Sequence, residues 1–176
     1  MREAIQSPPK TILEVYQMLP EGTRAELINR ILYISPAPSL KHQETVVAIT
    51  GQLYNFSLKK KIGKIYLGPV DVYLDEKNAF QPDLVLILNE NISILKPDGI
   101  YGAPDFIIEI LSPGTRNFDL VKKKKVYEKA GVKEYWVVDP ATRECTGFLL
   151  SKGKFEELKK EKGKIVSVLL KHTFKF

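Results

Sequence analysis

A glutamate lies inside a run of residues that is otherwise typical of a protein core. Residues 105–111 are mostly apolar and rich in β-branched side chains, and Pro104 and a Ser-Pro-Gly sequence bound them, as is typical of a strand buried on both faces. Glu109 interrupts this run. Taking an ionised carboxylate out of water costs several kcal/mol unless a partner, a metal ion or a shifted pKa offsets the loss. Glu109 is therefore the first candidate for chemistry.

The segment that follows this strand has the spacing of a helix. Residues 119–130 are helical in pattern, with Asp119 as the expected N-cap and Gly131 where a left-handed C-terminal residue is usual. The expected apolar stripe consists of Leu120, Val126, Tyr127 and Ala130. This stripe is the face that the helix should turn toward a sheet.

Four consecutive lysines occupy residues 122–125 of this helix and at first resemble a solvent-exposed face. Because successive helical residues are about 100° apart, the four cannot all face solvent. Lys123 falls near the middle of the apolar stripe. Lys122 and Lys125 point away from the stripe, and Lys124 lies at its edge. One lysine is therefore predicted to point at the sheet.

A second carboxylate begins another strand of the same buried type. Asp83 follows Gln-Pro and precedes the run Leu-Val-Leu-Ile-Leu. From these residue types alone, two interpretations stand level. Either Glu109 and Lys123 form a buried ion pair that fixes the helix on the sheet while Asp83 caps a turn, or the three side chains form a catalytic site.

Several segments around these residues resemble the Uma2 family, which was formerly a domain of unknown function. The resemblance consists of Pro-Asp-Leu-Val from residue 82, Pro-Asp-Phe-Ile-Ile-Glu-Ile-Leu-Ser-Pro from residue 104, the spacing of Asp119, Lys123 and Tyr127, Gly-Val-Lys-Glu-Tyr-Trp-Val-Val-Asp-Pro from residue 131, Glu-Leu-Ile from residue 26 and His-Gln from residue 42. It covers most of the chain from about residue 20 to about residue 140 and is specific as a set. The family is placed among the PD-(D/E)XK restriction-endonuclease-like proteins.

The resemblance implies hydrolysis of DNA phosphodiester bonds. It assigns Mg²⁺ or Mn²⁺ to Asp83 and Glu109 and gives Lys123 the role of orienting or activating the attacking water. Two carboxylates with one or two such ions and a nearby lysine supply the nucleophile, the charge neutralisation and the help for the leaving oxygen that this reaction needs. The superfamily's usual lysine lies two residues beyond the glutamate, where this chain has Leu111. Lys123 must therefore reach the same point from the following helix.

Three further side chains are candidates for auxiliary roles. Glu26 is either an additional carboxylate of the site or a solvent-facing residue of an edge strand. His42 extends the apolar stripe of a long helix expected over residues 38–61, which also suits a hydrogen-bonded core histidine. If His42 and Gln43 lie near the cluster, positioning of a phosphate is their expected role.

Strands interleaved with two good helices predict an α/β or α+β fold, and the resemblance specifies a restriction-endonuclease-like mixed β-sheet core flanked by helices. The other expected elements are a short helix over residues 11–19, a hairpin of residues 25–28 and 31–35 around Asn29-Arg30, strands over residues 64–67, 69–74 and 134–138, and an antiparallel tail of residues 145–150, 155–159 and 165–170. Residues 75–78 are expected to form a polar loop and residues 89–101 an irregular excursion.

The whole chain, residues 1–176, is expected to be a single restriction-endonuclease-like domain, because a chain of this length buries about 70% of its unfolded surface. A single cysteine, Cys145, excludes an internal disulfide and a cysteine-based zinc site. We find no signal-peptide pattern and no apolar run of membrane-spanning length, which predicts a cytoplasmic protein without a membrane partner. The net charge of +6 favours a polyanionic partner.

Three functional hypotheses follow. The first is a Mg²⁺-dependent endonuclease that acts on DNA, and the second is a non-catalytic nucleic-acid-binding or assembly protein on the same fold. The third, a purely structural dimer, rests on the aromatic-rich segment around Tyr135-Trp136 and on the tail strands. A homodimer also suits the first hypothesis, because two active sites cut both strands of a duplex most readily.

Overall fold

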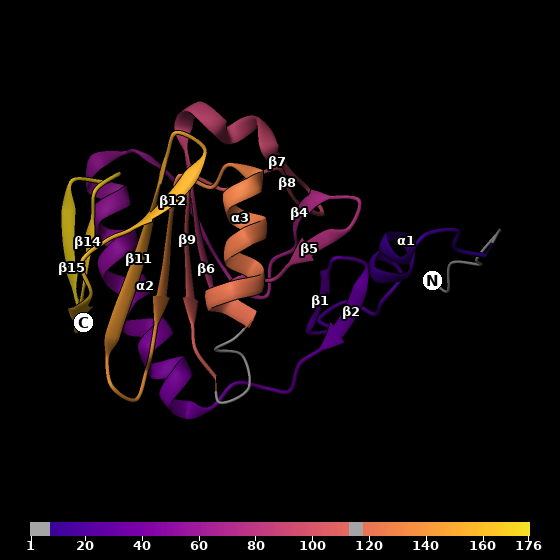
Figure 1. Cartoon of the computed structure of the whole chain (residues 1–176), viewed down its shortest axis with the longest axis horizontal. Helices are drawn as coiled ribbons and strands as arrows, with labels where there is room; N and C mark the ends of the chain where they lie inside the picture. The colour runs from indigo at the N-terminus through magenta and orange to yellow at the C-terminus, as the bar shows by residue number, and fades with distance from the viewer. Residues whose placement is uncertain (1–7, 113–117) are drawn as a thin grey trace.

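The protein, described by a computed structural model over residues 8–112 and 118–176, is organised by two β-sheets (Figure 1). The larger sheet consists, in spatial order, of β12 (Lys154–Glu157), β11 (Glu144–Ser151), β10 (Glu134–Val138), β9 (Phe106–Ile110), β6 (Leu84–Leu88) and β3 (Gly63–Leu67), with β13 (Glu161–Lys162) beside β11. The smaller sheet consists of β2 (Ile31–Ile34), β1 (Ala25–Ile28), β5 (Asn78–Phe80), β4 (Val72–Asp75), β8 (Gly99–Tyr101) and β7 (Leu95–Lys96). A separate two-stranded ladder pairs β14 (Lys164–Ser167) with β15 (His172–Lys175).

Helices cover both faces of the larger sheet. The helical segments are α1 (Ile12–Gln17), α2 (Leu40–Lys60), the 3₁₀ segment η1 (Asn89–Ile94), the π-helical segment η2 (Phe118–Lys123) and α3 (Lys124–Ala130). Figure 1 shows the strands of the larger sheet between α2 on one side and α3 on the other, with β1, β2 and α1 extending away from them. The predicted mixed sheet flanked by helices is therefore confirmed.

Strand alternation divides the core into two layers. The α2 layer contains Ile49, Leu53, Leu84, Leu86, Phe106, Ile108, Ile110, Trp136 and Val138. The α3 layer contains Phe80, Val85, Ile87, Ile107, Tyr127, Tyr135 and Val137. Consecutive residues of a strand point to opposite faces, so the continuous apolar runs of β6, β9 and β10 supply both layers at once.

The register of β6 and β9 determines where the two predicted carboxylates lie. These strands are antiparallel, with Leu84 paired to Ile108 and Val85 to Ile107. Continuing this register by one residue places Asp83 opposite Glu109. Because side chains alternate, both residues share the face of Val85 and Ile107, which is the face that α3 covers.

A serine caps the N-terminus of the long helix α2. Ser39 is that cap, and its hydroxyl accepts a hydrogen bond from the backbone N–H of His42 at 3.2 Å. The buried face of α2 consists of His42, Thr45, Ile49, Leu53 and Ser57. The expected helix over residues 38–61 is thus confirmed within two residues at each end, and His42 does lie on its inner face.

The second predicted helix forms, but it begins differently from the expectation. Its first turn is the π-helical segment η2, and Asp119 lies inside this turn with a buried side chain. The predicted N-cap role of Asp119 is therefore wrong. Its carboxylate forms an ion pair with Lys123, at 3.3 Å. The end of the helix is as predicted, because Gly131 adopts φ +94°.

The orientation of the four lysines is as predicted. Lys123 is only 5% exposed, whereas Lys122 and Lys125 are exposed and Lys124 is half-buried. The ammonium of Lys124 lies 4.1 Å from the centroid of the Phe148 ring. A helical stripe of apolar residues therefore predicted which lysine points inward.

The hairpin between β1 and β2 forms without a glycine. Asn29 and Arg30 have φ values of +50° and +67°, which is the geometry of a two-residue type I′ turn. The side chain of Asn78 accepts a hydrogen bond from the backbone N–H of Asn29 at 2.9 Å, and the carbonyl of Lys77 accepts one from Arg30 at 3.0 Å. The contacts with Lys77 and Asn78 thus stabilise the positive φ values of Asn29 and Arg30, which are unfavourable for residues other than glycine.

Other expectations needed correction where the strands are short. The two strands around Gly68 belong to different sheets, since β3 pairs with β6 and β4 pairs with β5 and β8. The expected loop at residues 75–78 is a tight turn into β5, and the excursion at residues 89–101 contains η1, β7 and β8. The last tail strand ends at Ser167 and pairs with β15, which was not predicted. Two- and three-residue strands leave too few residues for a periodic pattern.

Candidate active site

One pocket gathers the predicted charged residues. It has a volume of about 580 Å³, and its walls include Glu26, His42, Asp83, Glu109, Asp119 and Lys123. Gln43 lines an adjoining pocket that shares Asp83 with the first. The structure therefore brings five of the six predicted site residues around one pocket and places the sixth next to it. We refer to the larger of these two as the acid pocket.

The ammonium of Lys123 is the centre of the cluster. It lies 2.8 Å from Glu26 Oε1, 3.0 Å from Glu109 Oε1 and 3.3 Å from Asp119 Oδ1. The carboxylates of Glu26 and Glu109 come from β1 and β9, so these two contacts join both sheets to the helix, whereas Asp119 belongs to the same segment η2 as Lys123. An ammonium has three hydrogen atoms, and here three carboxylates surround it.

Burial and neighbouring charges shift the pKa values of this cluster. Burial raises the pKa of Glu109 well above its usual value, even though the charge of Lys123 acts in the opposite direction. Burial alone would lower the pKa of Lys123, but the charges of Glu109, Glu26 and Asp119 outweigh it and hold the pKa of Lys123 well above its usual value. Lys123 is therefore a cation at neutral pH and is not a proton acceptor.

Glu109 is held at one of its two oxygens. Its Oε1 atom accepts hydrogen bonds from Lys123 at 3.0 Å and from the Tyr127 hydroxyl at 2.9 Å. Within the part of the chain that the structure describes, no hydrogen bond or ion pair involves Oε2. Tyr127, which the sequence analysis treated as part of the apolar stripe, therefore also fixes the carboxylate.

Asp83 is held in a similar way. Its Oδ2 atom accepts a hydrogen bond from the backbone N–H of Ile110 at 2.7 Å and lies 3.2 Å from His42 Nε2. Over residues 8–112 and 118–176, no such contact involves Oδ1. His42 is thus a buried, hydrogen-bonded histidine, as one interpretation expected, and its partner is the first carboxylate of the predicted pair.

These residues fit a divalent cation bound by two carboxylates. Asp83 and Glu109 each have one oxygen fixed by the protein and one without a protein partner among the described residues, and three contacts join Lys123 to Glu26, Glu109 and Asp119 in the pocket that Asp83 also lines. No three described His, Cys, Asp or Glu side chains are grouped so as to hold a metal ion by themselves. Mg²⁺ commonly uses only one or two carboxylates and takes its other ligands from water and substrate phosphates.

Glu26 is not the solvent-facing residue of an edge strand that one interpretation expected. Its strand β1 lies between β2 and β5, and the side chain is only 15% exposed. Besides Lys123, its Oε1 atom accepts a hydrogen bond from the backbone N–H of Gln81 at 3.1 Å. Glu26 therefore links the smaller sheet to the segment that leads into Asp83.

The sequence analysis missed two residues of this region. Arg24 and Gln81 both line the acid pocket and the adjoining one. The Gln81 amide accepts a hydrogen bond from Ala25 N–H at 3.2 Å and donates to Asp71 at 2.9 Å. Neither residue has a local sequence signal. Gln81 acts through contacts with segments far away in the chain, and Arg24 directly precedes the short strand β1.

Comparison with known proteins identifies the family. The Uma2 family, described as "Putative restriction endonuclease", matches residues 12–173. The chain belongs to the Uma2 family. This confirms the resemblance found in the sequence and extends it to almost the whole chain.

A solved structure supports the same fold for this Uma2 protein. It is the crystal structure of a putative nuclease belonging to DUF820 from Anabaena variabilis, with 19% sequence identity, coverage of 92% of this chain and 91% of that chain, and a TM-score of 0.74. A comparison with curated proteins finds no match. None of the described helices of this Uma2 protein is long and apolar enough to cross a membrane.

The contacts of Lys123 predict a large effect on stability. Lys123→Met leaves Glu26, Glu109 and Asp119 buried without their cation, so the free energy of unfolding should fall by about 3 to 5 kcal/mol. Urea denaturation in the presence of EDTA measures this change. The exposed neighbour Lys125 provides the control, and Lys125→Met should change stability by at most about 0.5 kcal/mol. Equal effects of the two substitutions would show that the cluster is not held by Lys123.

Proposed function

We propose that this protein is a Mg²⁺-dependent endonuclease that hydrolyses DNA phosphodiester bonds. The observation that supports this most strongly is the pairing of Asp83 and Glu109 across β6 and β9 beside a buried, charged lysine. The family description is that of a nuclease, which gives the reaction class. The metal ion, the DNA substrate and the roles of these residues are our proposal.

Asp83 and Glu109 would bind the cation through the oxygens that have no partner among the described residues. When bound, Mg²⁺ or Mn²⁺ lowers the pKa of its water and neutralises charge on the phosphate. The backbone N–H of Ile110 and the ring of His42 orient Asp83, and Lys123 and Tyr127 orient Glu109. Each carboxylate is thus held in place before the cation arrives, which lowers the cost of ordering the site.

Lys123 would act as a fixed positive charge. Its raised pKa keeps the ammonium protonated, so it can orient the attacking water and stabilise negative charge that develops on the phosphate oxygens, but it does not remove a proton. The position two residues beyond Glu109 is occupied by Leu111, which is 7% exposed. The lysine therefore comes from the helix, and its ammonium nevertheless contacts the glutamate directly.

A basic pocket next to the acid pocket supports a polyanionic substrate. It has a volume of about 600 Å³, and its walls include Lys77, Lys122, Lys125 and Lys129 against one acid, Asp75. The acid and basic pockets share Ile28 and Tyr33, so the lysines lie beside the proposed cutting site. The phosphates that flank a cleaved bond are negatively charged, and lysines neutralise that charge without recognising the base sequence.

Cleavage of a supercoiled plasmid in Mg²⁺ or Mn²⁺ tests the proposal. Asp83→Asn and Glu109→Gln should each lower the rate at least about a hundredfold, because stabilisation by a catalytic metal ion is worth several kcal/mol. Glu156→Gln removes one exposed carboxylate from β12 and should leave the rate unchanged. Cleavage that persists in both site variants would come from a different site or a contaminant, and the endonuclease proposal would then fail.

We also propose that the protein is a homodimer. The face of α2 opposite its buried side exposes Leu40, Tyr54 and Leu58, which lie on one stripe of the helix. A second copy that packs against this stripe would cover it and would provide the second site needed to cut both strands.

Light scattering tests the dimer. Wild type should have twice the mass of one chain, and Tyr54→Glu, which places a charge in the apolar stripe, should have the mass of one. Asn55→Glu adds the same charge at an exposed α2 position outside the stripe and should leave the dimer intact. A monomeric wild-type protein would contradict this proposal without affecting the proposed reaction.

A further inference from the structure

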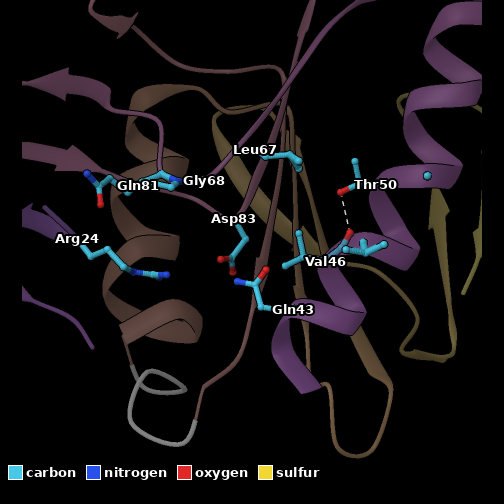
Figure 2. A pocket seen from close by; sticks show the side chains of 11 residues that line it. Arg24, Gln43, Val46, Thr50, Leu67, Gly68, Gln81 and Asp83 are labelled. Atoms are coloured by element: carbon cyan, nitrogen blue, oxygen red, sulfur yellow. Dashed lines mark hydrogen bonds between the residues drawn. The ribbon is translucent and has the colours of Figure 1, made fainter. Parts of the chain in front are cut away.

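Arg24 lies between the acid pocket and a second pocket along α2. This second pocket, which we call the α2 pocket, has a volume of about 370 Å³ and is bounded by α2 on one side and by the residues around Gly68 on the other. Figure 2 shows Arg24 extending its guanidinium group from one wall toward Asp83 and Gln43. The two pockets share Arg24, Gln81 and Asp83, so the α2 pocket opens directly beside the proposed cutting site.

The guanidinium group of Arg24 has no protein partner among the described residues. Its Nε atom is buried from solvent and makes no hydrogen bond there. Arginine remains charged at all physiological pH values and presents its donors in a planar fork. A buried donor without an acceptor costs free energy, so a folded protein retains one where a ligand supplies the acceptor.

Among the described residues, the carboxylates of the acid pocket contact other groups, and none forms an ion pair with Arg24. Glu26, Glu109 and Asp119 surround Lys123, and Asp83 is held by Ile110 and His42. The remaining acceptor must therefore come from outside the described protein. An anion with several oxygens matches the fork geometry of the guanidinium group, and a phosphate is the anion that a nuclease substrate brings.

The walls of the α2 pocket suit the rest of a nucleotide. Val46, Val47, Leu67 and Pro69 form an apolar side, and the Gln43 side chain is exposed next to Asp83. Figure 2 shows Gln43, Val46 and Thr50 projecting from the same side of α2. An apolar wall accepts a sugar or a base face without distinguishing one base from another, while a cation at the mouth holds the phosphate.

We propose that Arg24 binds a backbone phosphate of the nucleic-acid strand beside the cut and that the adjoining nucleoside occupies the α2 pocket. This inference rests on the proposed nuclease function for the nature of the ligand, but it concerns binding and not the chemical step. Arg24 is a substrate-binding residue outside the acid pair. A phosphate held between Arg24 and the Asp83 side of the acid pocket would be positioned for attack at the neighbouring bond.

Binding of a fluorescently labelled DNA oligonucleotide in EDTA tests this inference without cleavage. Arg24→Gln should weaken binding about tenfold at low salt and reduce the slope of log K against log salt concentration by about one, as expected for the loss of one phosphate contact. Arg24→Lys should restore the wild-type salt dependence, because the positive charge is kept. It should restore only part of the affinity for DNA, because an ammonium lacks the planar, bidentate donors of a guanidinium group.

Lys59→Gln provides a control with the same change in charge. Lys59 is exposed near the end of α2, about 24 Å along the helix from Gln43, and its substitution should leave both the affinity and the slope unchanged. A purely structural Arg24 would instead lower the melting temperature of Arg24→Gln without altering the slope, and that result would overturn the inference. Absence of binding by the wild-type protein would overturn it as well.

The two proposals can fail separately in this experiment. If the wild type binds DNA with the expected dependence on Arg24 but never cuts it, the nuclease proposal fails and Arg24 remains a phosphate contact. If the wild type cuts DNA and Arg24→Gln binds as well as wild type with the same salt slope, only the role of Arg24 is contradicted.

Discussion

The arrangement of the site depends on one buried ammonium among three carboxylates. Lys123 contacts Glu26 from the smaller sheet, Glu109 from the larger sheet and Asp119 from its own helix. Charges taken out of water must be compensated, so none of these side chains can be placed independently of the others. The relative positions of two sheets and a helix are therefore linked to a single contact point, which lies at the wall of the acid pocket.

This constraint places a lysine of a helix beside a carboxylate of a strand. The strand position beyond Glu109 is filled by the buried Leu111, which belongs to the core. The π-helical turn η2 contains both Asp119 and Lys123, and it brings the ammonium to 3.0 Å from Glu109. The protein thus keeps an apolar residue in the strand and still places a cation beside the carboxylate. The acid pocket is lined by four carboxyl groups, those of Glu26, Asp83, Glu109 and Asp119, together with the ammonium of Lys123 and the guanidinium group of Arg24.

Local patterns in the sequence predicted the orientation of side chains but not the assembly of the site. The apolar stripe predicted that Lys123 faces inward, and the interrupted core strand singled out Glu109. The position of Asp83 opposite Glu109 follows from the antiparallel register of β6 and β9, which no local pattern specifies. The residue types alone left a shared site and a structural ion pair level, and the family resemblance favoured the shared site. Arg24 was missed because it precedes a short strand and has no periodic neighbours, and Asp119 was misjudged because a π-helical turn resembles an α-helical one in sequence.

Titration calorimetry with Mn²⁺ tests most directly whether Asp83 and Glu109 form a cation site. The wild-type protein should bind Mn²⁺ without nucleic acid present, and Glu109→Gln, which preserves the shape of the side chain but removes its charge, should abolish or greatly weaken that binding. A wild-type protein that binds no Mn²⁺, or binding that survives Glu109→Gln unchanged, would contradict the account and would leave a buried ion-pair cluster with a structural role.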